Sequence, residues 1–124
     1  MGMIYNPTIK NNETWTLFIT ITQPGGAPFD LTTYTGKSQI RTHDGLTILG
    51  TPVVTMVAPT LGQLKVVLPL AQAVLLKPTP TTATCLAKSP LPIWDVVVGN
   101  VDASNVFEVV SGDVTVKAGV TTWT

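Results

Sequence analysis

Apolar and polar residues alternate along several short stretches of the chain, most regularly between residues 13 and 22. The apolar positions on one face are Trp15, Leu17, Ile19 and Ile21. Threonines at 16, 20 and 22 occupy the other face, and this period of two predicts a half-buried strand. Phe18 falls among the threonines, where it either packs within the chain, which the pattern favours, or contacts a partner.

The strongest strand signal lies near the end of the chain. Residues 93–98 and 106–110 are rich in β-branched and aromatic side chains, and the turn-forming sequence NVDASN lies between them. After Gly112, residues 113–117 continue as a further short strand. We expect this hairpin and its extension to form the centre of the fold.

The rest of the chain divides into short strands separated by Gly, Pro and Asp turns. The expected strands cover residues 35–41, 46–49, 52–57 and 63–68. In residues 35–41, Gly36 and Ser38 fall on the inward face, which predicts close approach by another strand or by Trp15. Residues 69–76 begin with Pro and are rich in Ala and Leu, which favours one or two helical turns.

About seven short strands at intervals near ten residues predict an all-β fold. We expect an immunoglobulin-like antiparallel β-sandwich with one short helix, over residues 13–124. Residues 1–12 lack periodicity and are expected to form an irregular leader that becomes ordered only in an assembly. Residues 78–92, rich in Pro and Thr, are expected to form a long loop, either solvent-exposed or in contact with a partner.

Charge is scarce in this chain. Seven basic and seven acidic side chains cancel, and charged residues make up 11% of the sequence, against about 25% in a typical soluble domain. The surface must therefore be covered by neutral polar side chains, which suits packing against other proteins. The basic residues are scattered, so we expect no nucleic-acid partner.

The sequence offers few groups for chemistry. The single cysteine, Cys85, excludes an internal disulfide and a thiolate zinc site, and its default role is that of a small buried apolar residue. His43 lies in a turn, where we expect it to be solvated. Asp95 interrupts an apolar strand, either as an outward residue on an edge or as a partner for Arg41 or Lys37. We expect no enzyme activity, no cofactor and no metal.

Membrane insertion and secretion also lack a signal. No apolar stretch is long enough to cross a bilayer, and the sequence MGMIYNP lacks the basic and apolar regions of a signal peptide. We therefore expect synthesis in the cytoplasm.

Several short motifs occur in a fixed order along the chain. They are PFDLT at 28–32 followed by Tyr34, QIR at 39–41, GQLKVVLPLA at 62–71, WDV at 94–96 and VVSGDVTV at 109–116. Taken together, this series resembles small immunoglobulin-like structural proteins of tailed bacteriophages. It is similar in particular to the N-terminal domain of baseplate upper and tail fibre proteins.

The resemblance implies a non-enzymatic virion protein, made in the cytoplasm of the bacterial host, in the tail, baseplate or fibre-attachment region. Its implied partners are other virion proteins and copies of itself. One alternative is a capsid decoration protein that stabilises the head. Another is a carbohydrate-binding module for host-surface glycans, which would need an exposed aromatic platform. Trp15 and Trp94 look buried, which leaves Trp123.

Contact with partners is expected at the Pro-rich loop and at two isolated aromatic residues. The candidate contact residues are Phe18, Pro78, Thr79, Pro80, Leu86, Pro90, Leu91 and Trp123.

Overall fold

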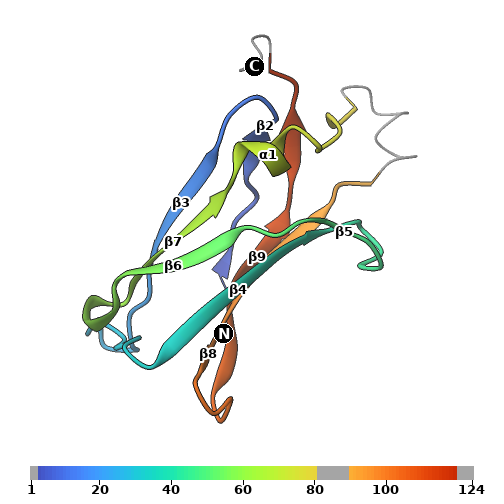
Figure 1. Ribbon diagram of the computed structural model, residues 1–124. Coiled ribbons are helices and arrows are strands. Elements are labelled where there is room, and N and C mark those ends of the chain that lie inside the picture. Colours follow the sequence, from blue (N-terminus) through green and yellow to red (C-terminus); the bar gives the residue numbers. More distant parts are fainter. Residues whose placement is uncertain (1–2, 81–89, 120–124) are drawn as a thin grey trace.

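The computed structural model describes residues 3–80 and 90–119, which form two facing β-layers with one short helix at one end (Figure 1). The first four strands are β1 (Met3–Ile4), β2 (Thr8–Lys10), β3 (Trp15–Thr20) and β4 (Tyr34–Arg41). They are followed by β5 (Ile48–Gly50), β6 (Val53–Ala58) and β7 (Gln63–Leu68). The last three are β8 (Ile93–Asn100), β9 (Val106–Asp113) and β10 (Thr115–Lys117).

The larger layer is a five-stranded sheet with the order β1-β9-β8-β4-β5. The predicted central hairpin is confirmed, because β8 occupies the middle of this sheet and pairs with β9 on one side and β4 on the other. Side chains at 94, 96 and 98 of β8 point into the core and are buried. The extension after Gly112 is also confirmed as the end of β9 and β10.

The smaller layer is a three-stranded antiparallel sheet with the order β3-β7-β6. Its alternating sequences place one set of side chains inward, as predicted for β3 and β7. Leu64, Val66 and Leu68 of β7 are fully buried against the larger sheet. The core is thus formed by the two inner faces.

The connectivity agrees with the predicted immunoglobulin-like sandwich. The order β3-β7-β6 corresponds to strands B-E-D of that fold, and β4-β8-β9 corresponds to C-F-G. The sheets approach closely at one corner, where a Cβ built on Gly36 of β4 would lie 2.4 Å from Cγ1 of Val54 on β6. The close approach predicted from Gly36 and Ser38 is therefore made by β6.

The N-terminal leader differs from the prediction. Residues 3–10 are not irregular: β1 pairs with β9 and β2 pairs with β10, both in parallel register. Pro7 and Ile9 are fully buried, and the indole Nε1–H of Trp94 donates to the carbonyl oxygen of Tyr5 at 2.9 Å. The reason is that the outer edge of β9 and β10 needs hydrogen-bond partners, which these short strands supply.

The helical segment is confirmed as a single turn, α1 (Leu70–Ala73), which follows Pro69 and continues in turns to Leu76. A short 3-10 helix, η1 (Pro59–Leu61), was not expected; it starts at a proline and ends at Gly62, which has a φ of +71°. Asp30 forms an Asx turn, in which its Oδ1 accepts from the backbone N–H of Thr32 at 2.9 Å.

Candidate functional site

A hollow of about 430 Å³ lies at one end of the sandwich, beside the helical turn. It brings together five of the predicted contact residues: Pro78, Thr79, Pro80, Pro90 and Leu91. Leu49, Leu75 and Leu76 add apolar lining from β5 and the helical segment. Two further predicted contact residues lie outside the described residues: Leu86 of the Pro-rich segment and Trp123 near the C-terminus. Cys85 lies outside them as well.

Backbone hydrogen bonds hold the two ends of the Pro-rich segment in place. Thr79 exchanges two bonds with Val116 of β10: its N–H donates to the Val116 carbonyl, and its Oγ1 accepts from the Val116 N–H, both at 2.8 Å. The N–H of Val114 donates to the carbonyl of Pro92 at 2.8 Å. These bonds fix the described prolines, so this wall of the hollow is positioned by the sandwich itself.

His43 is exposed at the rim of this hollow, as expected of a turn histidine. Its Nδ1 lies 3.2 Å from the carbonyl oxygen of Leu91, so the tautomer protonated at Nδ1 can donate there. The contact ties the turn after β4 to the Pro-rich segment. It is a positioning contact between two loops.

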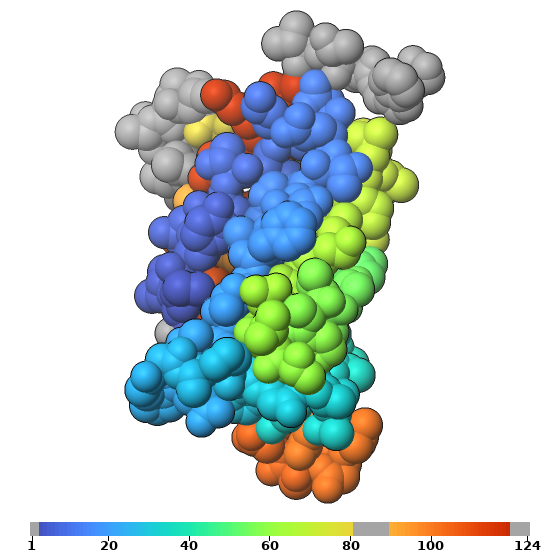
Figure 2. Space-filling model, turned by 90° about the vertical axis from the view of Figure 1, so that its left-hand side faces the viewer, coloured from blue at the N-terminus to red at the C-terminus, as the bar shows by residue number. Residues whose placement is uncertain are grey.

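Phe18 lies elsewhere, on the outer face of β3, and 69% of its surface is exposed. Packing of this ring within the chain, which the pattern favoured, is therefore wrong. Figure 2 looks onto this side of the molecule, where β3 and the green segments of β6 and β7 form the surface. No element of the described part of the chain covers this sheet face.

The outer face of β3, β7 and β6 is almost free of charge. Its nine outward positions are Thr16, Phe18 and Thr20 of β3, Gln63, Lys65 and Val67 of β7, and Val53, Thr55 and Val57 of β6. Lys65 is the one charge in this set. Val53 and Val57 are about half exposed, and sequence reasoning missed them because VVTMVA is apolar at nearly every position and so does not mark which side faces out.

The opposite outer face, on the five-stranded sheet, has a different character. Its outward positions on β4, β8 and β9 include five charged side chains: Lys37, Arg41, Asp95, Glu108 and Asp113. Burying this face against a protein would require each charge to find a partner. The face of β3, β7 and β6, which we name the B-E-D face, carries only Lys65, so removing it from water costs less free energy.

Two of the strand edges, those of β9 with β10 and of β6, are less available than the B-E-D face. The outer edge of β9 and β10 is partly covered by β1 and β2. The register of β6 shifts between Met56 and Ala58, and Pro52 and Pro59 flank this strand. Bulges and prolines of this kind discourage pairing with another strand.

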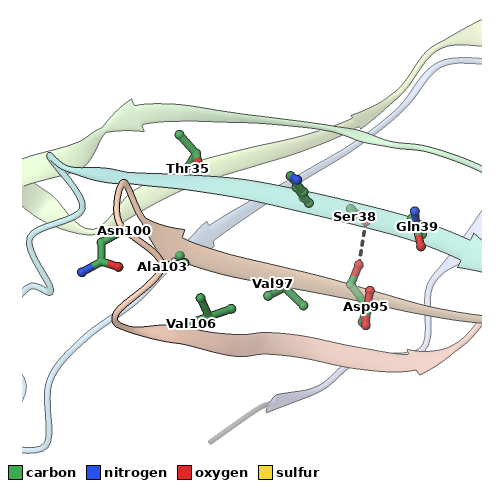
Figure 3. A pocket seen from close by; sticks show the side chains of 10 residues that line it. Thr35, Ser38, Gln39, Asp95, Val97, Asn100, Ala103 and Val106 are labelled. Atoms are coloured by element: carbon green, nitrogen blue, oxygen red, sulfur yellow. Dashed lines mark hydrogen bonds between the residues drawn. The ribbon is translucent and has the colours of Figure 1, made fainter.

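A shallow polar groove runs along the charged face, with a volume of about 400 Å³ (Figure 3). Thr35, Lys37 and Gln39 contribute from β4, and Asp95 and Val97 from β8. Burial raises the pKa of Asp95, with a further contribution from the nearby Glu108 carboxylate, while the positive charge of Arg41 opposes the rise.

The expectations for Asp95 are resolved by its position. Its strand is central, so Asp95 is not on an edge. Arg41 donates instead to Oε1 of Gln39, at 2.9 Å from Nε, and to the Gly45 carbonyl, at 2.9 Å from Nη1. The groove thus holds a partly buried carboxylate whose pKa is influenced by the charges of Glu108 and Arg41.

Other kinds of site find little support among the described residues. No group of three or more His, Cys, Asp or Glu side chains is placed to hold a metal ion there. Trp94 is 3% exposed and stacks edge-on against Trp15 at 5.5 Å, so neither forms an open aromatic platform. Within the described ranges, no helix has the length and apolar character to span a membrane.

Comparison with protein-family models and with curated proteins found no match to this chain.

Proposed function

We propose that this chain is a non-enzymatic structural protein of a bacteriophage virion, which assembles through protein–protein contacts in the tail, baseplate or fibre-attachment region. The observation that carries the proposal is the B-E-D face, which presents an exposed Phe18 and one charge in nine outward positions. Such a face loses little hydration energy on burial, because few charged groups must leave water.

The PFDLT motif, which is part of the phage-like series, has a structural role in the fold. Leu31 of the PFDLT motif is fully buried, and Asp30 closes the turn beside it. The ring of Phe29 packs edge-on against Tyr34, at 5.4 Å, and against Phe107, at 5.5 Å. The PFDLT motif and Tyr34 thus help to build one end of the sandwich.

The hollow near the helical turn supplies a second contact surface. It is lined mainly by Pro and Leu side chains and lies at the opposite end of the sandwich from the β8–β9 turn (Figure 1). A subunit that presents one nearly uncharged face and one apolar end can contact two neighbours at once. This arrangement is suited to a subunit within a larger assembly.

Immunogold labelling of intact phage particles with antibody against this chain tests the proposal. Label at the tail end is the expected result. Label over the head would replace this location with that of a capsid decoration protein. Protein found in the lysate with no label on any particle would overturn the proposed function.

A further inference from the structure

The outer edge of β3 is an open strand edge. β3 is an end strand of the sheet β3-β7-β6, and just beyond it the N–H of Ile21 donates toward β7, to the Gly62 carbonyl at 2.8 Å. Because backbone groups alternate in direction along a strand, those of Thr16, Phe18 and Thr20 point away from β7. Within the described part of the chain, the N–H and C=O groups of these three residues have no partner.

This edge lacks the features that protect other strand edges. β3 pairs with β7 in an unbroken register, whereas the register of β6 shifts. Residues 14–22 contain no proline and no charged side chain. Such residues, together with bulges, are the usual means by which proteins prevent pairing at an edge. The edge of β3 can therefore accept a further strand.

The sequence of this edge is nearly symmetric about Phe18. When residues 14–22 pair antiparallel with the same residues of a second copy, Phe18 can face Phe18. The other facing residues are then Leu17 with Ile19, Thr16 with Thr20, Trp15 with Ile21, and Thr14 with Thr22. Threonine meets threonine and apolar side chains meet apolar ones, which are favourable cross-strand pairs. A strand of this kind complements a second copy of itself.

We propose that β3 pairs edge to edge with β3 of a second copy of this chain, about a two-fold axis that passes beside Phe18. The inference deepens the proposed function and rests on it in treating the chain as a subunit that assembles through protein contacts. At this register the outward N–H and C=O groups of Thr16, Phe18 and Thr20 in one copy meet complementary groups in the other. The two three-stranded sheets become one continuous sheet, and the contact closes as a dimer.

A register shifted by two residues loses part of this match. Pairing centred on Thr16 places the Glu13 carboxylate opposite an apolar residue. Pairing centred on Thr20 places Pro24, which has no N–H to donate, opposite Thr16. In both cases Phe18 faces a threonine instead of a second aromatic ring. The register centred on Phe18 is therefore the favoured one.

The side of the sandwich that carries this edge adds apolar contact. β1 lies on the same side of the molecule (Figure 2), and its Met3 surrounds a hollow of about 270 Å³ together with Ile21, Phe107 and Val109. The two-fold axis is perpendicular to the joined sheet, so these sides of the two copies face each other. A side about 30 Å long and 20 Å wide covers about 600 Å², against about 800 Å² per partner in a standard interface. We therefore expect a reversible dimer, held mainly by backbone hydrogen bonds, that forms as protein concentration rises.

Amide hydrogen exchange, followed by NMR at low and high protein concentration, tests the pairing residue by residue. The N–H groups of Thr16, Phe18 and Thr20 should exchange at least tenfold more slowly at the high concentration. Those of Leu17 and Ile19, which point toward β7, are the internal control and should be protected at both concentrations. Unchanged exchange of the three outward groups would overturn the proposal.

Charge variants in sedimentation velocity test the register. The wild-type protein should shift from monomer to dimer as its concentration rises, and a monomer at every concentration would refute the pairing. Because residue 16 faces residue 20 of the other copy, Thr16→Lys combined with Thr20→Glu should strengthen the dimer, whereas Thr16→Lys combined with Thr20→Lys should abolish it.

The matched control is Val53→Lys combined with Val57→Lys, which places the same two charges at exposed positions of β6 and should leave the dimer unchanged. Equal effects of the two lysine pairs, or no difference between the Lys–Glu and Lys–Lys variants of β3, would contradict the proposed register. Because both tests use purified protein, their failure leaves the immunogold result, and with it the proposed function, unaffected.

Discussion

At the scale of single residues, Gly62 shows how backbone geometry constrains this fold. Its φ of +71° is in the left-handed region, and a Cβ built there lies 2.2 Å from the carbonyl oxygen of Ile21. Gly45 has a similar φ of +77°, but nothing lies within 4 Å of its built Cβ. A side chain at Gly45 would therefore lose stability through backbone strain alone, whereas one at Gly62 would lose it through strain and a steric clash.

We expect Gly62→Ala to lower the free energy of unfolding by more than about 2 kcal/mol, because left-handed strain and displacement of the Ile21 carbonyl add together. Gly45→Ala should cost about 1 kcal/mol, from the strain alone. Urea unfolding curves of the two variants give the comparison. Equal losses would mean that the backbone near Ile21 moves freely to accept a methyl group.

Asp95 gives a prediction about pH. Its pKa is raised in the folded protein, mainly by burial, so its ionisation is harder in the folded state than in the unfolded state. Its contribution to stability is therefore full below the unfolded pKa of about 3.9 and is lost as pH rises through the folded pKa. Asp95→Asn should raise stability at pH 7, by no more than about 1 kcal/mol, and have no such effect at pH 3.5.

Urea midpoints of wild type and Asp95→Asn at the two pH values measure this difference. Asp30, Asp44 and Asp102 have lowered pKa values, because Thr and Ser side chains and nearby backbone N–H groups donate hydrogen bonds to their carboxylates. Their contributions to the pH dependence of stability are opposite in sign to that of Asp95. They cancel when wild type and variant are compared at the same pH. A stabilisation of the same size at both pH values would show that packing, rather than charge, is responsible.

At the scale of elements, the N-terminal strands test whether residues 3–10 are part of the sandwich. Ile9 is fully buried on β2, whereas Ile4 on β1 is 76% exposed. Ile9→Ala should cost about 2–5 kcal/mol, because it removes buried methyl groups and leaves a cavity. Ile4→Ala should change stability by less than about 0.5 kcal/mol. A neutral Ile9→Ala in thermal unfolding would restore the view of an irregular leader.

Strand prediction succeeded where alternation extended over six or more residues. In β3, β4 and β7 the side chains on the predicted inner face are the more buried ones. It failed for β1 and β2, because strands of two and three residues contain too few positions to show a period, and no glycine turn signal links them to a longer strand, as Gly45 and Gly112 link the short strands β5 and β10. Their pairing is decided by the open edge of β9 and β10, more than a hundred residues away in sequence.

The candidate contact surfaces were likewise predicted only in part from the sequence. The Pro-rich composition of 78–92 indicated a loop with contacts, and the described prolines do line one hollow. Composition could not show that His43, Leu49 and Leu75 complete it, because these residues come from three separate segments. Phe18 was noticed as an exception to the pattern, but only the sheet order showed that nothing in the described part of the chain covers it.

At the scale of the whole molecule, charge balance predicts solution behaviour. The formal net charge is zero and the isoelectric point is near pH 6.5, so copies of the chain repel one another least near that pH. We expect solubility to be lowest near pH 6.5 and to rise severalfold two pH units to either side. Polyethylene glycol precipitation midpoints across pH 4.5–8.5 check this, and a flat profile would contradict it.

The sequence by itself determined the fold class, the central hairpin and the low surface charge, because periodicity and composition are local properties that any segment displays alone. Tertiary structure decided which face of the sandwich carries few charges, how the N-terminal strands close an open edge, and which side chains meet in the end hollow. Those outcomes depend on pairing between distant segments. Such pairing follows from satisfying backbone hydrogen bonds and burying apolar area over the whole molecule, which no local pattern records.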